Sequence, residues 1–591
     1  MIGQFSTPEE VSLQDLAQHS PQRRFQTATF YVRVFSMYVI PIVLIPLIRT
    51  RSPRNHCAYV VLNMVFFWLF ESLPPAIVSW IPLFLLPCFV RIDIAQLLEY
   101  YISETTLMYI GYAMVMNEVE NTHLHKRLIL TLLLMLGAKT GFVIGGFVMT
   151  AVIVSMWTSA VRTAAVLLPI AMEAIQHVQD NRLCHILELR TMDIRKRRPS
   201  AAPPRIGTPI MEARFLIDSD IVIPDVIHIL HEFFSVRKKL LIGISFSAVL
   251  GSMGSVFGCG ASIFVKALLA EIYNYHNLTL YNWFVCHMPL TVLCALLLWI
   301  ILTTCYLTES MVNDHITRRA FQDVIYRRLE ELGPIKRPEL LVLAVIIVFA
   351  LYTTVRHINN SLENEAPSAV ATSESMAVLI AFLAVYTITV CFDDAEWSDM
   401  EENNWDLRLR NSVKHLSWAL VITIGAGICV MKLILVFDLL EYIEGMLPRR
   451  LVQSPFGLQL VVVLTALVMA EINDSLNNIV VFTPLLCCAS RLAKIHPDYL
   501  LTPFVYCSNF GFLLPTATPI SEFVADFADL QDDDFLLPGL ALKLGCTSLV
   551  LLAYNTWCWD YLHLSHSNLT LWQTNDTLVA AAARPQNSWL D

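Results

Sequence analysis

Apolar stretches long enough to cross a lipid bilayer recur along the whole chain and alternate with short polar segments. A helix needs roughly 20 apolar residues to cross a hydrocarbon core of about 30 Å. The pattern therefore predicts an all-α polytopic membrane protein with about eleven spans and some shorter re-entrant segments. The apolar stretches lie at 30–49, 57–90, 103–117, 127–178, 240–272, 284–308, 339–355, 376–392, 416–440, 456–490, 499–520 and 535–558.

Composition supports this interpretation and excludes other classes. Of the 591 residues, 56% are hydrophobic and only 15% are charged, whereas roughly a quarter of the residues in a soluble domain are charged. The net charge of −10 is spread over the loops and lacks the clustered basic face that a nucleic-acid-binding protein needs. Most of the fourteen cysteines lie in apolar stretches without CxxC spacing, so we expect buried thiols rather than a disulfide framework.

The distribution of charge and of glycosylation sequences predicts the topology. Lysine and arginine gather before and after the first span and in 190–239 and 318–337, which we therefore expect in the cytoplasm. The acceptor asparagines Asn568 and Asn575 lie in a tail whose single basic residue is Arg584, and Asn359 lies in the polar stretch 356–374. We expect these three asparagines to be glycosylated outside the cell, while the side of Asn277 stays open. An inner amino terminus and an outer carboxyl terminus require an odd number of spans, most simply in the plasma membrane.

The polar segments also suggest how the chain is divided. Hairpins that re-enter the membrane are expected near 140–175 and 456–490. The predicted parts are a cytoplasmic amino terminus (1–29), a first membrane block (30–178), a cytoplasmic linker with an amphipathic segment (179–239), the end of a first repeat (240–312), a basic cytoplasmic loop (313–338), a second membrane block (339–558) and an extracellular tail (559–591).

A weak internal repeat links the two membrane blocks. Aligning Pro169 with Pro484, a shift of 315 residues, places Ser159-Ala-Val-Arg-Thr opposite Asp474-Ser-Leu-Asn-Asn. A second pair of interruptions follows, at 251–260 and 512–521, where glycine or proline unwinds an apolar helix. Interrupted helices at matching places in two halves are typical of the midplane binding site of a transporter. The alternative is a structural bundle of kinked helices.

Several motifs occur in the order found in one known family. They are Cys57-Ala-Tyr-Val60 with Glu71 and Pro74, Leu124-His-Lys-Arg127, Gly137-Ala-Lys139, Ser155-Met-Trp157, Leu514-Pro-Thr-Ala-Thr-Pro519 and Asn555-Thr-Trp557. On these motifs the chain resembles the divalent anion/sodium symporters, the dicarboxylate, citrate and sulfate carriers that include the insect "I'm not dead yet" transporters. The resemblance implies a homodimer in membrane lipid, with two inverted repeats and with a scaffold domain and a transport domain that moves like an elevator. It also implies hairpin tips carrying Ser-Asn-Thr motifs that bind substrate carboxylates and sodium.

The chain departs from the family at each of these tips. The first motif is Ser159-Ala160-Val161 and the second is Asp474-Ser475-Leu476. The turns that complete the sodium sites in the family are here Cys259-Gly-Ala-Ser262 and Thr518-Pro-Ile-Ser521, and both lack the family's asparagine. Because each lost donor leaves a bound carboxylate under-solvated by ~1–3 kcal/mol, an unmodified dicarboxylate site would be weakened by orders of magnitude.

These segments supply the candidate site residues. For substrate they are Ser159, Arg162, Thr163, Asp474, Ser475, Asn477, Asn478 and Thr518. For a retained cation site they are Ser159, Gly258, Gly260, Asp474, Thr518 and Ser521. The polar residues beside the tips have an alternative role as caps of broken helices. No resident cofactor is expected, and the coupling ion is Na⁺ or H⁺ if there is one.

Arg162 is a cation within an apolar run, and such a residue needs water, a ligand or a carboxylate partner. Three roles are open: binding a substrate carboxylate in place of sodium, pairing with Asp474, or reaching a hydrated hairpin surface. Asp474 could ligate a cation or carry a transported proton.

Two functions follow. The leading hypothesis is a secondary carrier of di- or tricarboxylates, such as succinate or citrate, that is sodium-independent or proton-coupled. The alternative is a transport-inactive relative that acts as a membrane binding partner. We do not expect an enzyme, because GxSxG, GxxxxGK[ST] and HExxH motifs are all missing from the sequence.

Overall fold

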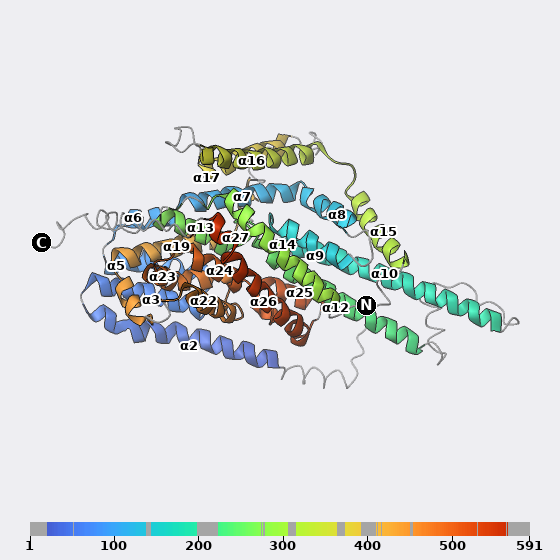
Figure 1. Ribbon diagram of the computed structural model, residues 1–591, viewed down its shortest axis with the longest axis horizontal. Helices are drawn as coiled ribbons and strands as arrows, with labels where there is room; N and C mark the ends of the chain where they lie inside the picture. Colours follow the sequence, from blue (N-terminus) through green and yellow to red (C-terminus); the bar gives the residue numbers. More distant parts are fainter. Residues whose placement is uncertain are drawn as a thin grey trace.

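The computed structural model describes residues 21–50, 52–90, 92–136, 143–197, 223–273, 275, 278–304, 315–362, 373–391, 409–410, 412–414, 416–448, 453–528, 530–562 and 564. Every regular element in these ranges is a helix (Figure 1). The predicted all-α class is therefore confirmed. The predicted glycosylation residues Asn568 and Asn575 lie outside the described residues. The backbone of Asn359 lies within a helix rather than in the polar loop expected there.

Six helical segments in the described part of the chain are long and apolar enough to cross a membrane. They are Tyr31–Arg49, Leu280–Thr304, Arg337–Ile358, Trp418–Val436, Ser475–Ala493 and Asp532–Tyr561. Four shorter apolar segments accompany them, at Pro75–Phe89, Val143–Ser155, Glu374–Thr389 and Pro455–Met469. The protein is thus a multi-pass membrane protein, while the total of about eleven spans stays a prediction.

The amino-terminal helices end where the sequence carries turn-forming residues. Glu71 has a positive φ of 46° just after α3, and Pro74 and Pro75 then start the next short helix. Ser103 forms a capping box at the start of α7, which satisfies free backbone N–H groups there. The helices of this region are α2 (Pro21–Arg49), α3 (Pro53–Leu69), α4 (Pro75–Val78), α5 (Ile81–Phe89), α6 (Ile94–Tyr101), α7 (Glu104–Asn121) and α8 (Leu124–Leu136).

Two helical hairpins occupy corresponding places in the two halves. The first joins α9 (Val143–Ser155) to α10 (Ala160–Arg197), and the second joins α22 (Pro455–Met469) to α23 (Ser475–Ala493). We call their turns tip 1 (residues 156–159) and tip 2 (residues 470–474). Pro169 and Pro484 both lie nine positions after the first residue of α10 and of α23. The register of the predicted repeat is therefore the register of the two hairpins.

Each hairpin is followed by an interrupted helix. The first runs as α12 (Ile223–Ser252) and α13 (Gly260–Tyr273), and the second as α24 (Asp498–Ser508), the 3₁₀ turn η4 (Pro515–Ala517) and α25 (Pro519–Ala528). We call the interruptions break 1 (residues 253–259) and break 2 (residues 509–518). The halves interlock, because α13 packs against α23 and α24 while α25 packs against α10 and α12.

The last helix of each half packs against its counterpart. The helix α14 (Leu280–Thr304) follows α13, and α26 (Asp532–Tyr554) with the short α27 (Trp557–Tyr561) follows α25. The helices α14 and α26 lie side by side in the core. The helices α19 (Trp418–Val436) and α20 (Leu440–Met446) complete the second half, where α19 packs against α6 and α13.

The described buried apolar residues form two clusters. The larger one runs through both hairpins and both interrupted helices. The smaller one joins α7 to α16 (Arg337–Leu362) and α17 (Glu374–Cys391) and includes Tyr112, Val342 and Val385. Figure 1 shows α16 and α17 along one edge of the molecule, with α7 between them and the rest. The helix α7 therefore connects the two clusters.

Helices extend into the segment predicted to be a linker. The helix α10 continues to Arg197, and α12 begins at Ile223, so both enter the range 179–239 from its ends. They run side by side and project from one end of the bundle (Figure 1). The helix α15 (His315–Glu331) packs against α10 and occupies much of the predicted basic loop. The membrane sides of these segments stay predictions.

Candidate functional site

The polar residues of tip 1 cap the start of α10. The Oγ atom of Ser159 accepts a hydrogen bond from the backbone N–H of Arg162 at 3.4 Å. The Thr163 hydroxyl lies 3.2 Å from the Ser159 carbonyl and 2.7 Å from the Oγ1 atom of Thr158. Thr163 is only 1% exposed. For Ser159 and Thr163 the structure thus shows the capping role that was the alternative to ligand binding.

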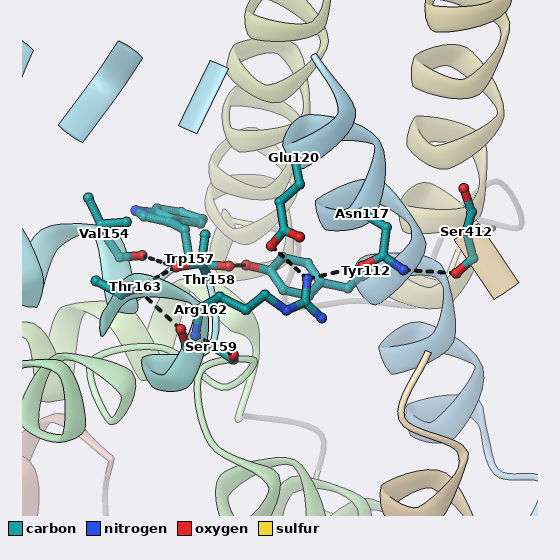
Figure 2. A network of polar contacts seen from close by, with 10 residues as sticks. All are labelled: Tyr112, Asn117, Glu120, Val154, Trp157, Thr158, Ser159, Arg162, Thr163 and Ser412. Carbon is teal, nitrogen blue, oxygen red and sulfur yellow. Dashed lines mark hydrogen bonds and ion pairs between the residues drawn. The ribbon is translucent and has the colours of Figure 1, made fainter. Parts of the chain in front are cut away.

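Arg162 forms an ion pair with a helix outside the repeat hairpins. Its Nη1 atom lies 2.8 Å from Glu120 Oε1 and 3.0 Å from Asn117 Oδ1, and both partners belong to α7 (Figure 2). The Asn117 amide in turn donates to the Ser412 carbonyl at 2.9 Å. The Arg162 and Glu120 side chains are 34% and 30% exposed. The arginine is therefore neutralised by a neighbouring carboxylate at a partly hydrated position.

This pairing corrects one of the three roles expected for Arg162. Among the described residues, the carboxylate that pairs with Arg162 is Glu120 of α7 and not Asp474. Glu120 and Asn117 were missed as site residues. The signal for them was present as Asn117-Glu118-Val119-Glu120, a polar run that closes an apolar stretch. Residues three apart share one face of a helix, so Asn117 and Glu120 reach Arg162 together.

Aromatic contacts reinforce the link between α7 and tip 1. The Tyr112 hydroxyl donates a hydrogen bond to the Trp157 carbonyl (Figure 2). The Tyr112 ring stacks on Phe257 in break 1, with centroids 3.7 Å apart and planes inclined by 8°. Within tip 1 and break 1, the Ser255 hydroxyl donates to the Met156 carbonyl. One helix therefore holds both tip 1 and break 1.

Tip 2 is organised by asparagines. Asp474 caps α23 by accepting the N–H of Leu476 at 3.2 Å, and its side chain is accessible to solvent. The Asn478 amide donates to the carbonyls of Met469 and Asn473, both at 3.1 Å. The Asn473 amide donates to the Trp68 and Leu69 carbonyls of α3 at 3.2 and 2.8 Å. Tip 2 is thus fastened both to itself and to α3.

Several buried polar groups around tip 2 are left without partners. In the described part of the chain, the Oδ1 atoms of Asn473 and Asn478 and the hydroxyl of Ser262 in α13 are buried and make no hydrogen bond. Leaving such groups unpaired costs about 1–3 kcal/mol each, and a bound ion or substrate would offset that cost.

Break 1 meets break 2 and the first residue of α23, directly after tip 2. The Cys259 Sγ atom lies 3.8 Å from Ser475 Oγ and 3.5 Å from Asn509 Oδ1. The two glycines beside it are tightly packed. A Cβ atom at Gly258 would lie 2.1 Å from the Ser252 carbonyl oxygen, and one at Gly260 would lie 2.8 Å from Leu420 Cδ1. Glycine is therefore required at position 258 by close approach of the backbone.

Break 2 is capped by its own hydroxyls. Thr518 Oγ1 donates to Ser521 Oγ at 2.9 Å and accepts the Ser521 N–H at 3.2 Å. The fully buried Ser521 hydroxyl also lies 3.1 Å from Ser245 Oγ on α12. These two candidates thus link the second interrupted helix to the first.

A buried ion pair that sequence reasoning missed fastens tip 2 to break 2. The Lys543 Nζ atom on α26 lies 2.6 Å from Glu471 Oε1, and the side chains are 6% and 14% exposed. The Glu471 carboxylate also accepts the backbone N–H groups of Leu513 and Leu514 at 3.3 and 3.2 Å. Two backbone N–H groups of break 2 are thereby satisfied.

The candidate residues therefore fall into two groups. Tip 2 and the first turn of α23 contact both breaks, and buried polar atoms without hydrogen-bond partners lie around them in the described part of the chain. Ser159, Arg162 and Thr163 instead cap tip 1 and bind it to α7. The arrangement can hold a small anion or a cation at tip 2 by amides, hydroxyls and the carboxylate of Asp474.

Comparison with known proteins agrees with this architecture. The sodium:sulfate symporter transmembrane region matches residues 26–565. A Na⁺/citrate cotransporter of Rattus norvegicus is 22% identical over 90% of this chain and 96% of its own length. Na⁺/dicarboxylate cotransporter 3 of the same species is 24% identical over 89% and 92%. Solute carrier family 13 member 1 of Mus musculus is 24% identical over 90% and 94%. The chain therefore belongs to the sodium:sulfate symporter family.

Proposed function

We propose that this protein is a secondary carrier of di- or tricarboxylates such as succinate or citrate, acting in the plasma membrane, and not an enzyme. Family membership and the names of its cotransporter relatives support the class. The observation that carries the proposal is the buried Ser262 hydroxyl of α13, which has no hydrogen-bond partner among the described residues. The helix α13 packs against α23, which carries the Asn477 amide. An amide and nearby hydroxyls are the donors that a carboxylate needs in a dry site.

A coupling cation is the second part of the proposal. The unpaired Oδ1 atoms of Asn473 and Asn478 are acceptors, and the Asp474 carboxylate lies between these two residues in the sequence. Oxygen atoms of this kind suit a hard cation such as Na⁺. Arg162 is poorly suited to replace the positive charge of a bound sodium ion, because Glu120 already neutralises the arginine. We therefore place a sodium site at tip 2 in preference to the sodium-independent or proton-coupled mechanism that the lost motifs suggest.

The experiment is uptake of labelled succinate and citrate by cells expressing the full chain. Uptake should require external sodium and should fall to background when choline replaces it. Uptake that is indifferent to choline would overturn the sodium site, and uptake that follows an inward proton gradient without sodium would assign the coupling to H⁺. If none of the tested carboxylates were taken up under a sodium or a proton gradient, the proposal that the protein is a carrier would be wrong.

A second candidate is a transport-inactive relative that serves as a membrane binding partner. The observation that favours it is the attachment of tip 1 to α7, where Arg162 binds Glu120 and Asn117 and Tyr112 binds Trp157. A hairpin held in this way would have to break several polar contacts in order to move. The variant Ala160→Asn, Val161→Thr, Asp474→Ser, Ser475→Asn, Leu476→Thr tests this candidate. Succinate uptake by that variant alone would show an inactive site on a mobile scaffold.

The domain motion and the assembly belong to the same proposal. An elevator movement would carry the hairpins and interrupted helices past α7, α16 and α17, which form their own buried cluster. A cysteine pair placed across α7 and α10 should then crosslink in one state and block uptake reversibly. We also propose a homodimer, which the mass of the detergent-solubilised protein would test.

A further inference from the structure

We propose that Cys286 on α14 and Cys558 on α27 form a disulfide bond in the mature protein. Their Sγ atoms lie 2.7 Å apart. Non-bonded heavy atoms pack at about 3.5–4.0 Å, whereas a disulfide bond measures about 2.05 Å. The two thiols are therefore closer than two unbonded groups would settle, and the bond requires only a small adjustment of their side chains.

Contacts around the two sulfur atoms fix the short helix α27 against α14. The Trp557 indole N–H donates to the Cys286 carbonyl at 3.1 Å, and the Tyr561 hydroxyl donates to Asn282 Oδ1 at 3.1 Å. Both cysteines are buried, at 1% and 0% exposure. The two residues are 272 positions apart in the sequence, so their meeting is a consequence of the tertiary structure and not of local chain geometry.

The surrounding sequence assigns this end of the molecule to an oxidising compartment. The acceptor Asn277 precedes α14 by three positions, and the acceptors Asn568 and Asn575 follow α27. Because α27 packs on the first turns of α14, the two helix ends lie on the same side of the membrane. The predicted outward tail then places Cys286 and Cys558 on the side where disulfides form and persist.

The oxidation balances through thiol–disulfide exchange. One cysteine thiolate attacks the disulfide of a dithiol oxidoreductase in the secretory lumen and forms a mixed disulfide, and the second thiolate displaces the enzyme. The two thiols lose two protons and two electrons, and the oxidoreductase leaves as a dithiol. Because both cysteines are buried in the folded protein, the exchange takes place before α27 docks.

The bond would join equivalent parts of the two halves. The helix α14 follows the first interrupted helix, and α26 with α27 follows the second. A covalent link between them would keep the outer ends of both repeats together while the hairpins move. This role is independent of the substrate, so it stands whether or not the protein is a carrier.

The test uses the full chain purified from eukaryotic cell membranes. The protein is unfolded with N-ethylmaleimide present to block free thiols, then reduced and treated with a large maleimide reagent that retards each labelled cysteine on a gel. Wild type should acquire two large labels only after reduction, and mass spectrometry should find the linked peptides of Cys286 and Cys558. Without unfolding, a mild reductant should leave the bond intact because it is buried.

Variants identify the pair. Cys286→Ser and Cys558→Ser should each abolish the reduction-dependent labels, whereas Cys294→Ser, at another buried cysteine of α14, should retain both. Wild-type protein that acquires no label after reduction would overturn the proposal, as would labels that persist in Cys286→Ser. The mass-spectrometric measurement on wild type keeps the proposal falsifiable if a variant fails to fold.

Discussion

Arg162 of α10 and Glu120 of α7 form an ion pair with 2.8 Å between Nη1 and Oε1. The pair joins the first turn after tip 1 to the helix that links the two buried clusters of the protein. It thereby gives this arginine within an apolar run a partner outside both repeat hairpins. Tip 1 is thus bound to α7 at the place where the sequence departs from the Ser-Asn-Thr motif that the family resemblance implies.

Mutation of this pair shows whether Arg162 binds tip 1 to α7 or binds the substrate. If Arg162 acts through Glu120, Arg162→Ala and Glu120→Gln should reduce carboxylate uptake to similar extents, and the double variant should be no worse than either. Because both side chains are about one-third exposed, their coupling free energy should be only about 0.2–1 kcal/mol. Thermal unfolding in detergent and uptake rates are the measurements. Uptake lost in Arg162→Ala but retained in Glu120→Gln would make the arginine a ligand.

Asn477 and Asn478 are adjacent but should behave differently. The Asn477 amide is a donor in the proposed carboxylate site, so Asn477→Ala should leave the melting temperature nearly unchanged and should lower substrate affinity by about 10-fold or more. Asn478 donates to Met469 and Asn473, so Asn478→Ala should destabilise the protein by about 1–3 kcal/mol. Concentration-dependent uptake and thermal unfolding would measure the two effects. Equal loss of stability in both variants would argue against a ligand role for Asn477.

Removing one charge of the buried ion pair of Lys543 and Glu471 should destabilise the protein strongly. Lys543→Met leaves the Glu471 carboxylate buried without its cation, which should cost about 3–5 kcal/mol. Glu471→Gln combined with Lys543→Met removes both charges and should be markedly less destabilising than Lys543→Met alone. Melting temperatures of the purified variants give the comparison. A double variant as unstable as the single one would mean that the hydrogen bonds of Glu471 to break 2, rather than the ion pair, provide the stabilisation.

Gly258 should tolerate no side chain. The Cβ atom of Gly258→Ala would lie 2.1 Å from the Ser252 carbonyl oxygen, so break 1 would have to shift, at about 1–3 kcal/mol or more. Gly445→Ala is a matched control, because nothing lies within 4 Å of its Cβ position and alanine favours the helix α20. The yield of folded protein and the melting temperature should fall only for the first variant. Normal folding of Gly258→Ala would show that break 1 is more adaptable than its packing indicates.

The amino-acid sequence alone was sufficient for the all-helical class of the protein and for the positions of its two hairpins and two interrupted helices. In a bilayer the backbone must satisfy its hydrogen bonds within the chain, so the lengths of the apolar runs lead directly to a membrane protein made of helices. Proline and glycine at matching places marked both hairpins and both interrupted helices, because their effect on the backbone is local.

The sequence alone did not show which residues from distant parts of the chain contact each other. Cys259 meets Ser475 and Asn509 because the two halves interlock, and Glu471 meets Lys543 on a later helix. The sequence showed that Arg162 needed a partner, since an unpaired cation is costly at membrane depth. Only the packing of α7 beside tip 1 decided that the partner is Glu120 and not Asp474, because an ion pair depends on distance in space, which the order of residues does not contain.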